Sequence, residues 1–336
     1  MRGKLVKFGH GVAMFAAISV GGAVAGGARA EAANACNRAC LDGFVNQYIA
    51  ALSAHDYRSL PVAPAVKYTE NDVVLKLGEG IWQSKGAIGG YRIYGADPVA
   101  GEAAFLGVYK QPGASDAIMF GLRLKIVDRK ITEIETIVPH DLAAINPDFG
   151  RAAAHLTVAR PGFGEVLLPF ERSPRATMIA IANSYYDGIE GGTGEIVAFA
   201  DDCHRIENGI ATTGNPTLIY PLVSPTGQKM PDFGEMGCRA QFNTRMYGAD
   251  SITGRRVSVV DEERGTVFVF AQYHTFTKAR CVDVPYYGPA CAPPGAGTVS
   301  LAMLEAHHIK NGKIHEQESV WTVLPGNHIK SPWVTP

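Results

Sequence analysis

The sequence predicts an α+β protein that contains two tandem units of the same fold. Short motifs recur in the same order in both halves, and in each half an amphipathic helical pattern precedes several strand patterns. Helices followed by a run of strands are typical of α+β folds. We expect each unit to be a curved antiparallel sheet wrapped around its N-terminal helices, forming a cone with one open mouth.

Length and composition agree with this expectation. The chain has 336 residues, which suits two domains of about 150 residues each. Apolar residues make up 46% of it and charged residues 19%, which is a globular composition. The formal net charge of -1 gives no long-range attraction to nucleic acid, and we expect no nucleic-acid partner.

The internal repeat consists of four matches. Matched residues of the two copies lie 137 positions apart in the sequence at first, then 153 and finally 183. A further match, of Tyr109 with Tyr273, has a separation of 164 and falls between the last two. Growing offsets predict insertions of 16, 11 and 19 residues in the second copy. The four pairs are Asn46 and Tyr48 with Asn183 and Tyr185, Tyr68–Asp72 with Arg205–Gly209, Arg92–Asp97 with Arg245–Asp250, and Lys130–Glu135 with Lys313–Glu318.

Each copy begins with a helical pattern. Apolar residues recur at helical spacing from Leu41 to Leu52 and again from Met178 to Ile189. A second, short helix is expected before the Glu-Asn motif, for example over Glu195–Ala200.

Strand patterns follow the helices in both copies. Arg129-Lys130 and Asn311-Gly312 are expected to form the hairpin turns before the last strand of each copy. The expected strands are Phe105–Tyr109, Ala117–Val127 and Ile131–Val138 in the first copy, and Thr266–Thr275, Val299–Ile309 and Ile314–Val323 in the second.

The first thirty residues have the pattern of a secretory signal peptide. Arg2, Lys4 and Lys7 precede an apolar stretch, and Ala28-Arg29-Ala30 supplies small residues for cleavage. A membrane anchor is the alternative, but the stretch is short and rich in glycine for a span of about 30 Å. We therefore expect a periplasmic or secreted protein with no membrane contact after cleavage.

All six cysteines follow the signal peptide, so export permits disulfides. Six cysteines allow 15 pairings. Proximity in sequence favours Cys36 with Cys40, Cys203 with Cys238, and Cys281 with Cys291. A zinc site is the alternative for these cysteines, but the Cys-x-x-Cys spacing typical of zinc sites is absent. We expect no bound metal.

The segments Phe199–Glu207 (FADDCHRIE) and Asn311–Glu316 (NGKIHE) resemble motifs of the nuclear transport factor 2-like, or SnoaL-like, superfamily. The resemblance covers nearly all of the mature chain, twice. It implies domains at 31–138 and 175–336, joined by a linker at 139–174. Members of this family commonly pair sheet to sheet, which implies an internal pseudo-dimer and allows a homo-oligomer. The fold hosts isomerases, dehydratases, lyases, cyclases and binding proteins, so it does not fix the activity.

A comparison of the two copies selects the candidate site, because polar residues found in one copy only are better candidates than shared ones. Side chains alternate faces along a strand. Phe120, Leu122, Leu124 and Ile126 of the first copy correspond to Met303, Glu305, His307 and Ile309 of the second. A buried Glu or His costs several kcal/mol unless it is paired, so these replacements need a structural or functional reason. In the same comparison, His274 of the second copy stands where the first has Lys110, next to Tyr273, which matches Tyr109. His204 likewise stands where the first copy has Lys67.

Two further residues, Glu207 and Tyr186, are candidates on other grounds. Glu207 matches, by its distance from the Asp-Asp pair, the catalytic carboxylate of ketosteroid isomerase in the same superfamily. Glu70 occupies that position in the first copy, so a shared structural role is the alternative. Tyr186 follows Tyr185, which is repeated as Tyr48 and is assigned to the core; Tyr186 is therefore the better pocket candidate.

The insertion 278–297 contains Tyr286 and Tyr287 between two cysteines. A stapled aromatic loop near the mouth of a cone is typical of a lid and favours an apolar or aromatic ligand. The alternative is that the insertion is a surface loop without a functional role.

These residues predict a cofactor-independent lyase or isomerase that moves protons on a small apolar molecule. The resemblance to SnoaL-like proteins, some of which cleave lignin-derived aromatic compounds, implies such a compound as one example. His307 is expected to be the base, Glu305 its orienting partner, and Glu207, His274 and Tyr186 supporting groups. No GxGxxG, P-loop, GxSxG or HExxH motif occurs, and we expect no cofactor. A non-catalytic small-molecule binder and a module that interacts through its sheet are the alternatives.

Overall fold

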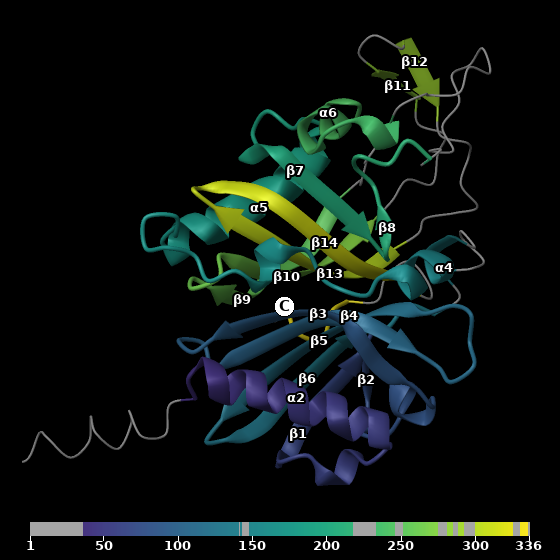
Figure 1. Cartoon of the computed structure of the whole chain (residues 1–336), viewed down its shortest axis with the longest axis vertical. Helices are drawn as coiled ribbons and strands as arrows, with labels where there is room; N and C mark the ends of the chain where they lie inside the picture. Colours follow the sequence, from purple (N-terminus) through teal and green to yellow (C-terminus); the bar gives the residue numbers. More distant parts are fainter. Residues whose placement is uncertain are drawn as a thin grey trace, which may run out of the picture. The chain divides into compact units, whose positions relative to one another are not determined.

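One long helix and one six-stranded sheet make up most of each half of the chain (Figure 1). The computed structural model describes residues 36–140, 142, 148–217, 233–245, 251–274, 281–284, 288–291, 300–324 and 330–334, with only the backbone of 281–284 and 288–291. These residues belong to one compact unit, Cys36–Pro336. The expected signal peptide lies outside the described residues.

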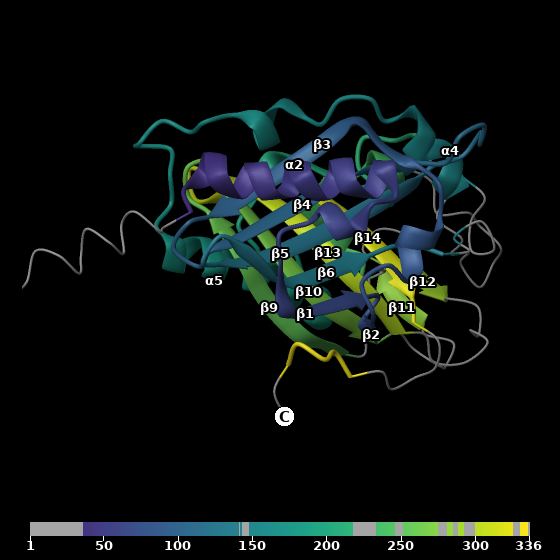
Figure 2. The same cartoon turned by 90° about the horizontal axis from the view of Figure 1, so that it is seen from below.

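The first half begins with helix α2 (Arg38–Ala54), which lies along the sheet across β3, β4 and β5 (Figure 2). The strand order is β2-β1-β6-β5-β4-β3. The helix buries seven side chains against this sheet, among them Leu41, Tyr48 and Leu52, as its periodicity predicts. The other elements are η1 (Tyr57–Ser59), β1 (Val62–Glu70), β2 (Val73–Leu75), η2 (Gly80–Gln83), β3 (Ala87–Asp97), β4 (Glu102–Lys110), β5 (Ile118–Val127) and β6 (Lys130–Ile137).

The second half repeats this plan with helix α5 (Arg175–Gly191) and the strand order β8-β7-β14-β13-β10-β9. Helices α4 (Asp148–His155) and η3 (Pro161–Gly164) lie between the halves in sequence. The remaining elements are β7 (Phe199–Glu207), β8 (Ile210–Ala211), η4 (Phe233–Glu235), α6 (Cys238–Asn243), β9 (Ser251–Asp261), β10 (Thr266–His274), β11 (Cys281–Val284), β12 (Gly288–Cys291), β13 (Ser300–Lys310) and β14 (Lys313–Val323).

The long helix and the six sheet strands of the first half correspond one to one with those of the second half. The offset is 137 residues from α2 to α5 and from β1 to β7, 164 from β3 to β9 and from β4 to β10, and 183 from β6 to β14. The second half therefore carries two insertions, of 27 and 19 residues, instead of the three that the motif matches predicted. The match of Arg92–Asp97 with Arg245–Asp250 was wrong, because the strand equivalent to β3 begins only at Ser251. The true counterpart of Asp97 is Asp261.

Both sheets are mixed, whereas the sequence predicted purely antiparallel ones. In each half the first strand pairs in parallel with the last, β1 with β6 and β7 with β14. The expected short helix over Glu195–Ala200 was also wrong: β7 begins at Phe199, and 195–198 form turns and bends. The parallel partner β14 supplies the backbone hydrogen bonds that a helix would otherwise satisfy internally.

The predicted strand pairs around the last hairpins are present. Asn311-Gly312 forms the β13–β14 turn as predicted, with positive φ at both residues. In the first half the turn residues are Asp128 and Arg129, one position earlier than predicted, and both also have positive φ. The structure therefore uses two left-handed residues in each turn, as tight hairpins require.

Three hydrophobic clusters form the core. One lies between α2 and the first sheet, and a second lies between α5 and the second sheet. The third contains side chains from both sheets, including Leu106 and Met119 of the first half and Phe268 and Leu304 of the second. The two sheets thus share apolar contacts within one unit.

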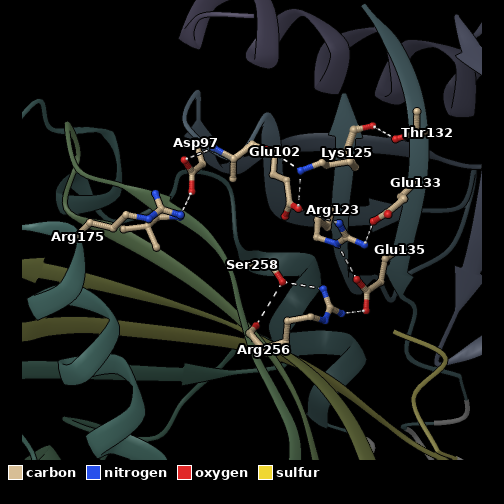
Figure 3. A network of polar contacts seen from close by, with 12 residues as sticks. Asp97, Glu102, Arg123, Lys125, Thr132, Glu133, Glu135, Arg175, Arg256 and Ser258 are labelled. Atoms are coloured by element: carbon tan, nitrogen blue, oxygen red, sulfur yellow. Dashed lines mark hydrogen bonds and ion pairs between the residues drawn. The ribbon is translucent and has the colours of Figure 1, made fainter. Parts of the chain in front are cut away.

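Asp97 at the end of β3 and Asp261 at the end of β9 make reciprocal hydrogen bonds between the two halves. The backbone N–H of Val260 donates to Asp97 (3.0 Å), and the backbone N–H of Ala96 donates to Asp261 (3.1 Å). Arg175 at the start of α5 pairs with Asp97, as Figure 3 shows, and Arg38 at the start of α2 pairs with Asp261.

A second group of charges surrounds the buried guanidinium of Arg123. It pairs with Glu102, Glu133 and Glu135 of the first half, and Glu135 also pairs with Arg256 of the second (Figure 3). The carboxylates thus satisfy a cation that is only 2% exposed.

Two of the predicted disulfides are confirmed, Cys36–Cys40 at the start of α2 and Cys203–Cys238 between β7 and α6. Cys281 and Cys291 are opposite each other in the β11–β12 pair, but their side chains lie outside the described part. Among the described residues, no helix has the length and hydropathy needed to cross a membrane.

Candidate functional site

A buried polar cluster lies between α5 and the second sheet. Met303, Glu305 and His307 alternate along β13 and face the interior, where Met303 joins the hydrophobic cluster. Tyr186 comes from α5 and Tyr273 from β10. The sequence places these side chains together because residues two apart on a strand share a face, and α5 covers that face.

Glu305 is the centre of the cluster and is 2% exposed. Its carboxylate accepts a hydrogen bond from the hydroxyl of Tyr273 (3.0 Å) and one from the side-chain amide of Gln317 (2.7 Å). The hydroxyl of Tyr186 lies 3.3 Å from Nε2 of His307, and it also interacts with Glu305. Tyr186 thus connects the carboxylate with the imidazole.

Burial controls the protonation of both central groups. Desolvation raises the pKa of Glu305 to about 7, opposed by the hydrogen bonds from Tyr186 and Tyr273. Desolvation, with the nearby charge of Arg205, lowers the pKa of His307 to about 3. Near neutral pH, therefore, Glu305 exists in both protonation states while His307 is a neutral, weakly basic imidazole.

Arg205 forms the other side of the cluster and is fully buried. Its guanidinium donates to the hydroxyl of Tyr185 (3.1 Å), to the side chain of Gln241 (3.1 Å) and to the carboxylate of Glu207. Burial raises the pKa of Glu207, and the charge of Arg205 opposes the rise. Glu207 therefore lies in an ion pair, as the structural alternative for this residue anticipated.

Some polar atoms of the cluster lack a partner. Within the described residues, Nδ1 of His307, Oε1 of Gln317 and Oγ of Ser319 make no hydrogen bond although they are buried. An unsatisfied buried polar atom costs about 1–3 kcal/mol.

Two predicted residues lie away from the cluster. His204 alternates with Arg205 on β7 and therefore faces the other side of the sheet, where burial lowers its pKa and Asp202 and Arg160 are the nearby charges. His274 ends β10 and contacts the hydroxyls of Thr253 (2.7 Å) and Ser300 (2.9 Å). Tyr286 and Tyr287 of the expected lid lie outside the described residues.

Sequence comparison passed over two members of the cluster. Gln317 corresponds to Ile134 and Arg205 to Tyr68 of the first half. The match of Tyr68 with Arg205 already lay within the repeat, and a comparison of Ile134 with Gln317 on the last strand selects Gln317 as it selected Glu305.

Comparisons with known proteins assign no activity. The profile of a family described as "Domain of unknown function (DUF8021)" matches residues 171–321, which is the second half alone. No curated protein matches the chain. Among solved structures, AclR from Streptomyces galilaeus, described as a "putative hydroxylase", is similar over 44% of this chain and 90% of its own, with 11% identity and a TM-score of 0.27.

Proposed function

We propose that the second half is a cofactor-independent lyase or isomerase that transfers protons on a small apolar or aromatic molecule. The observation that carries the proposal is the buried Glu305 carboxyl, whose pKa of about 7 suits a general base or acid at neutral pH. Lignin-derived aromatic compounds are one substrate class of suitable polarity. Elimination, dehydration, deformylation and isomerisation all require the transfer of a proton to or from the substrate.

In this mechanism Glu305 is the base rather than the orienting partner that the sequence suggested. The carboxylate takes a proton from a carbon acid, so that the C–H bond breaks and an O–H bond forms on Glu305. The electron pair of the broken C–H bond stays on the substrate and is delocalised onto an adjacent carbonyl oxygen, and the hydroxyls of Tyr186 and Tyr273 can donate hydrogen bonds to the resulting oxyanion. His307, with its pKa near 3, supports Tyr186 through Nε2.

Turnover assays with a matched pair of variants test this role. The protein is incubated without cofactor against a panel of small aromatic substrates. Glu305→Gln should lower kcat/KM by at least about a hundredfold, the range of general acid-base catalysis. Leu122→Met changes the equivalent position of the first half and should leave kcat/KM within about twofold.

The two outcomes separate catalysis from binding. If the panel is bound but never converted by the wild-type protein, the second half is a binding protein. If Glu305→Gln turns over substrate as fast as Leu122→Met, Glu305 has no part in the chemistry. Melting temperatures of both variants show whether the fold is retained.

We further propose that each half is a SnoaL-like cone and that the two pair sheet to sheet as an internal pseudo-dimer. The shared hydrophobic cluster and the reciprocal bonds of Asp97 and Asp261 support this pairing. The disulfides are consistent with a periplasmic or secreted location. A monomeric mass in solution at all concentrations would fit internal pairing, and concentration-dependent dimerisation through the sheets would contradict it.

A further inference from the structure

The two oxygens of the Glu305 carboxylate have different partners. Oε1 accepts a hydrogen bond from Nε2 of Gln317 at 2.7 Å, and Oε2 accepts one from the hydroxyl of Tyr273 at 3.0 Å. Both Glu305 and Gln317 are buried, so these contacts lie away from bulk water. The carboxyl group is therefore bound by an amide at one oxygen and by a phenol at the other.

The register of the second sheet places the amide beside the carboxylate. Gln317 on β14 lies opposite His307 on β13. Glu305 lies opposite Ser319, which is two residues further along β14 and shares the face of Gln317. Gln317 thus reaches Glu305 along a diagonal between neighbouring strands. On the other side of β14, Arg205 of β7 is the register partner of Gln317, so the amide is enclosed by strands on both sides.

The first half has apolar side chains at both positions. Leu122 corresponds to Glu305 and Ile134 to Gln317, and both are fully buried. An amide or a carboxylate is unfavourable in such an interior unless another polar group pairs with it. The pairing of Gln317 with Glu305 is therefore a specific feature of the second half rather than a property of the shared fold.

The chemistry of an amide restricts where Glu305 can hold a proton. The NH₂ group of glutamine donates hydrogen bonds and does not accept them, whereas a phenol hydroxyl does both. A proton on Oε1 would weaken the bond from Gln317 and would find no acceptor on the nitrogen that faces it. A proton on Oε2 leaves Oε1 as the carbonyl oxygen, which still accepts from Gln317, and the new O–H can be directed to the oxygen of Tyr273. Protonation at Oε2 is therefore favoured.

We propose that Gln317 is a positioning residue, which keeps Oε1 of Glu305 unprotonated and thereby makes Oε2 the oxygen that takes the proton from the substrate. This inference rests on the proposed function. The C–H bond of the substrate breaks, an O–H bond forms on Oε2, and the electron pair is delocalised onto the adjacent carbonyl oxygen. Oε2 faces a phenol hydroxyl that would bind this oxyanion. The substrate class is therefore a carbonyl compound whose acidic carbon is adjacent to the carbonyl group.

Infrared difference spectra test which oxygen carries the proton. Spectra at about pH 5 and about pH 9 bracket the pKa of Glu305, which is about 7, and the C=O band of its protonated carboxyl is the one missing in Glu305→Gln. Gln317→Met removes the amide donor. If Oε1 is the carbonyl oxygen, loss of this hydrogen bond should move the band to higher wavenumber. The midpoint of the titration should also rise, by about one pH unit, because the amide stabilises the ionised carboxylate.

Two further variants control for packing. Ile134→Met introduces the same side chain at the equivalent position of the first half and should change neither the wavenumber nor the midpoint. Gln317→Leu removes the amide with a different shape and should reproduce the shift of Gln317→Met. Melting temperatures show that each variant is folded. An unchanged wavenumber in both Gln317 variants would place the carbonyl bond at Oε2 and overturn the proposal.

Turnover separates this inference from the proposed function. Proton abstraction needs the ionised carboxylate, so in Gln317→Met the rise of kcat/KM with pH should move upward by the same amount, about one pH unit. If the wild-type protein converts no substrate while the infrared band moves, the proposed function fails and Gln317 still determines the protonated oxygen. If substrate is converted but the band does not move, the proposed function stands and the role of Gln317 is overturned.

Discussion

Leu122 and Leu124 are fully buried beside α2, whereas Glu305 and His307 stand at the same two points of the second sheet. The surrounding positions change with them. Ile49 becomes Tyr186, Ile134 becomes Gln317, and Tyr68 becomes Arg205. One backbone frame therefore tolerates either an apolar core or a connected polar cluster, provided that several positions change together.

The comparison also shows which contacts hold the charged groups. Glu305 is buried beside hydroxyl and amide donors, and their hydrogen bonds partly offset the free-energy cost of removing the carboxylate from water. A carboxylate at Leu122 would lie opposite Phe105 on β4 and Thr136 on β6, and the Thr136 hydroxyl already donates to the backbone carbonyl of Thr69. The same side chain should therefore be tolerated in one half and disruptive in the other.

Leu122→Glu should have the largest effect. It buries a carboxyl without hydrogen-bond partners and should lower the free energy of unfolding by about 4–5 kcal/mol at pH 7. Urea unfolding measures the change. Leu122→Met, with similar volume and no charge, should cost less than about 1.5 kcal/mol. A loss for Leu122→Glu no greater than for the methionine would contradict the contrast between the two cores.

The two disulfides, one in each half, should contribute differently to the free energy of unfolding. Cys203–Cys238 closes a loop of 35 residues and Cys36–Cys40 a loop of 4. Loop entropy then predicts losses of about 4 and about 2 kcal/mol for the double Cys→Ala variants. Thermal unfolding of both variants under identical conditions measures the difference, and an equal loss would argue against an entropic origin.

Glu305 should make stability depend on pH. Its pKa is raised from 4.5 to about 7, so the folded protein binds a proton more tightly than the unfolded chain between these values. The stability contributed by the protonated carboxyl is complete below pH 4.5 and is lost as pH rises through about 7. The wild-type protein should therefore lose about 3 kcal/mol relative to Glu305→Gln across this window. If the free energies of unfolding of the two proteins change with pH by the same amount, the pKa of Glu305 is not raised.

The hairpin turns should give the smallest effect. Arg129 and Gly312 occupy equivalent positions with φ of 57° and 72°. Gly312→Arg should cost about 1 kcal/mol, because a side chain is strained in the left-handed region. Arg129→Gly should gain less than this, because glycine also increases the entropy of the unfolded chain. Melting temperatures of the two variants should therefore move in opposite directions.

The repeat and the strand periodicity were sufficient to predict α2, α5 and the hairpins of both halves. The strands β1 and β7 were missed because each pairs in parallel with a strand far along the chain, and local periodicity does not report such pairing. The match of Arg92–Asp97 with Arg245–Asp250 was wrong because it followed residue identity, whereas the strand equivalent to β3 begins later, at Ser251. The 164-residue offset between β3 and β9 and the reciprocal bonds of Asp97 and Asp261 show the true correspondence.

For the site, the comparison of copies found Glu305 and His307 because each replaces a leucine, and it found Tyr186 because the neighbouring Tyr185 is repeated as Tyr48. It could not find the division of roles, since protonation depends on the depth of burial and the position of Arg205. It also placed His204 and His274 near the site, because it followed residue type and not the alternation of faces along β7 and β10.

The reciprocal bonds of Asp97 and Asp261 have a consequence for how the two halves can change. Contacts in which each partner repeats the other's role are the pattern of a symmetric homodimer. In separate identical chains, every substitution would appear twice, and dilution would weaken the pair. Within one chain, tethering holds the halves together at an effective concentration of the order of millimolar, whatever the protein concentration. The halves of a single chain can therefore differ in their interiors, one with a polar cluster and the other apolar, while they stay tethered at any protein concentration.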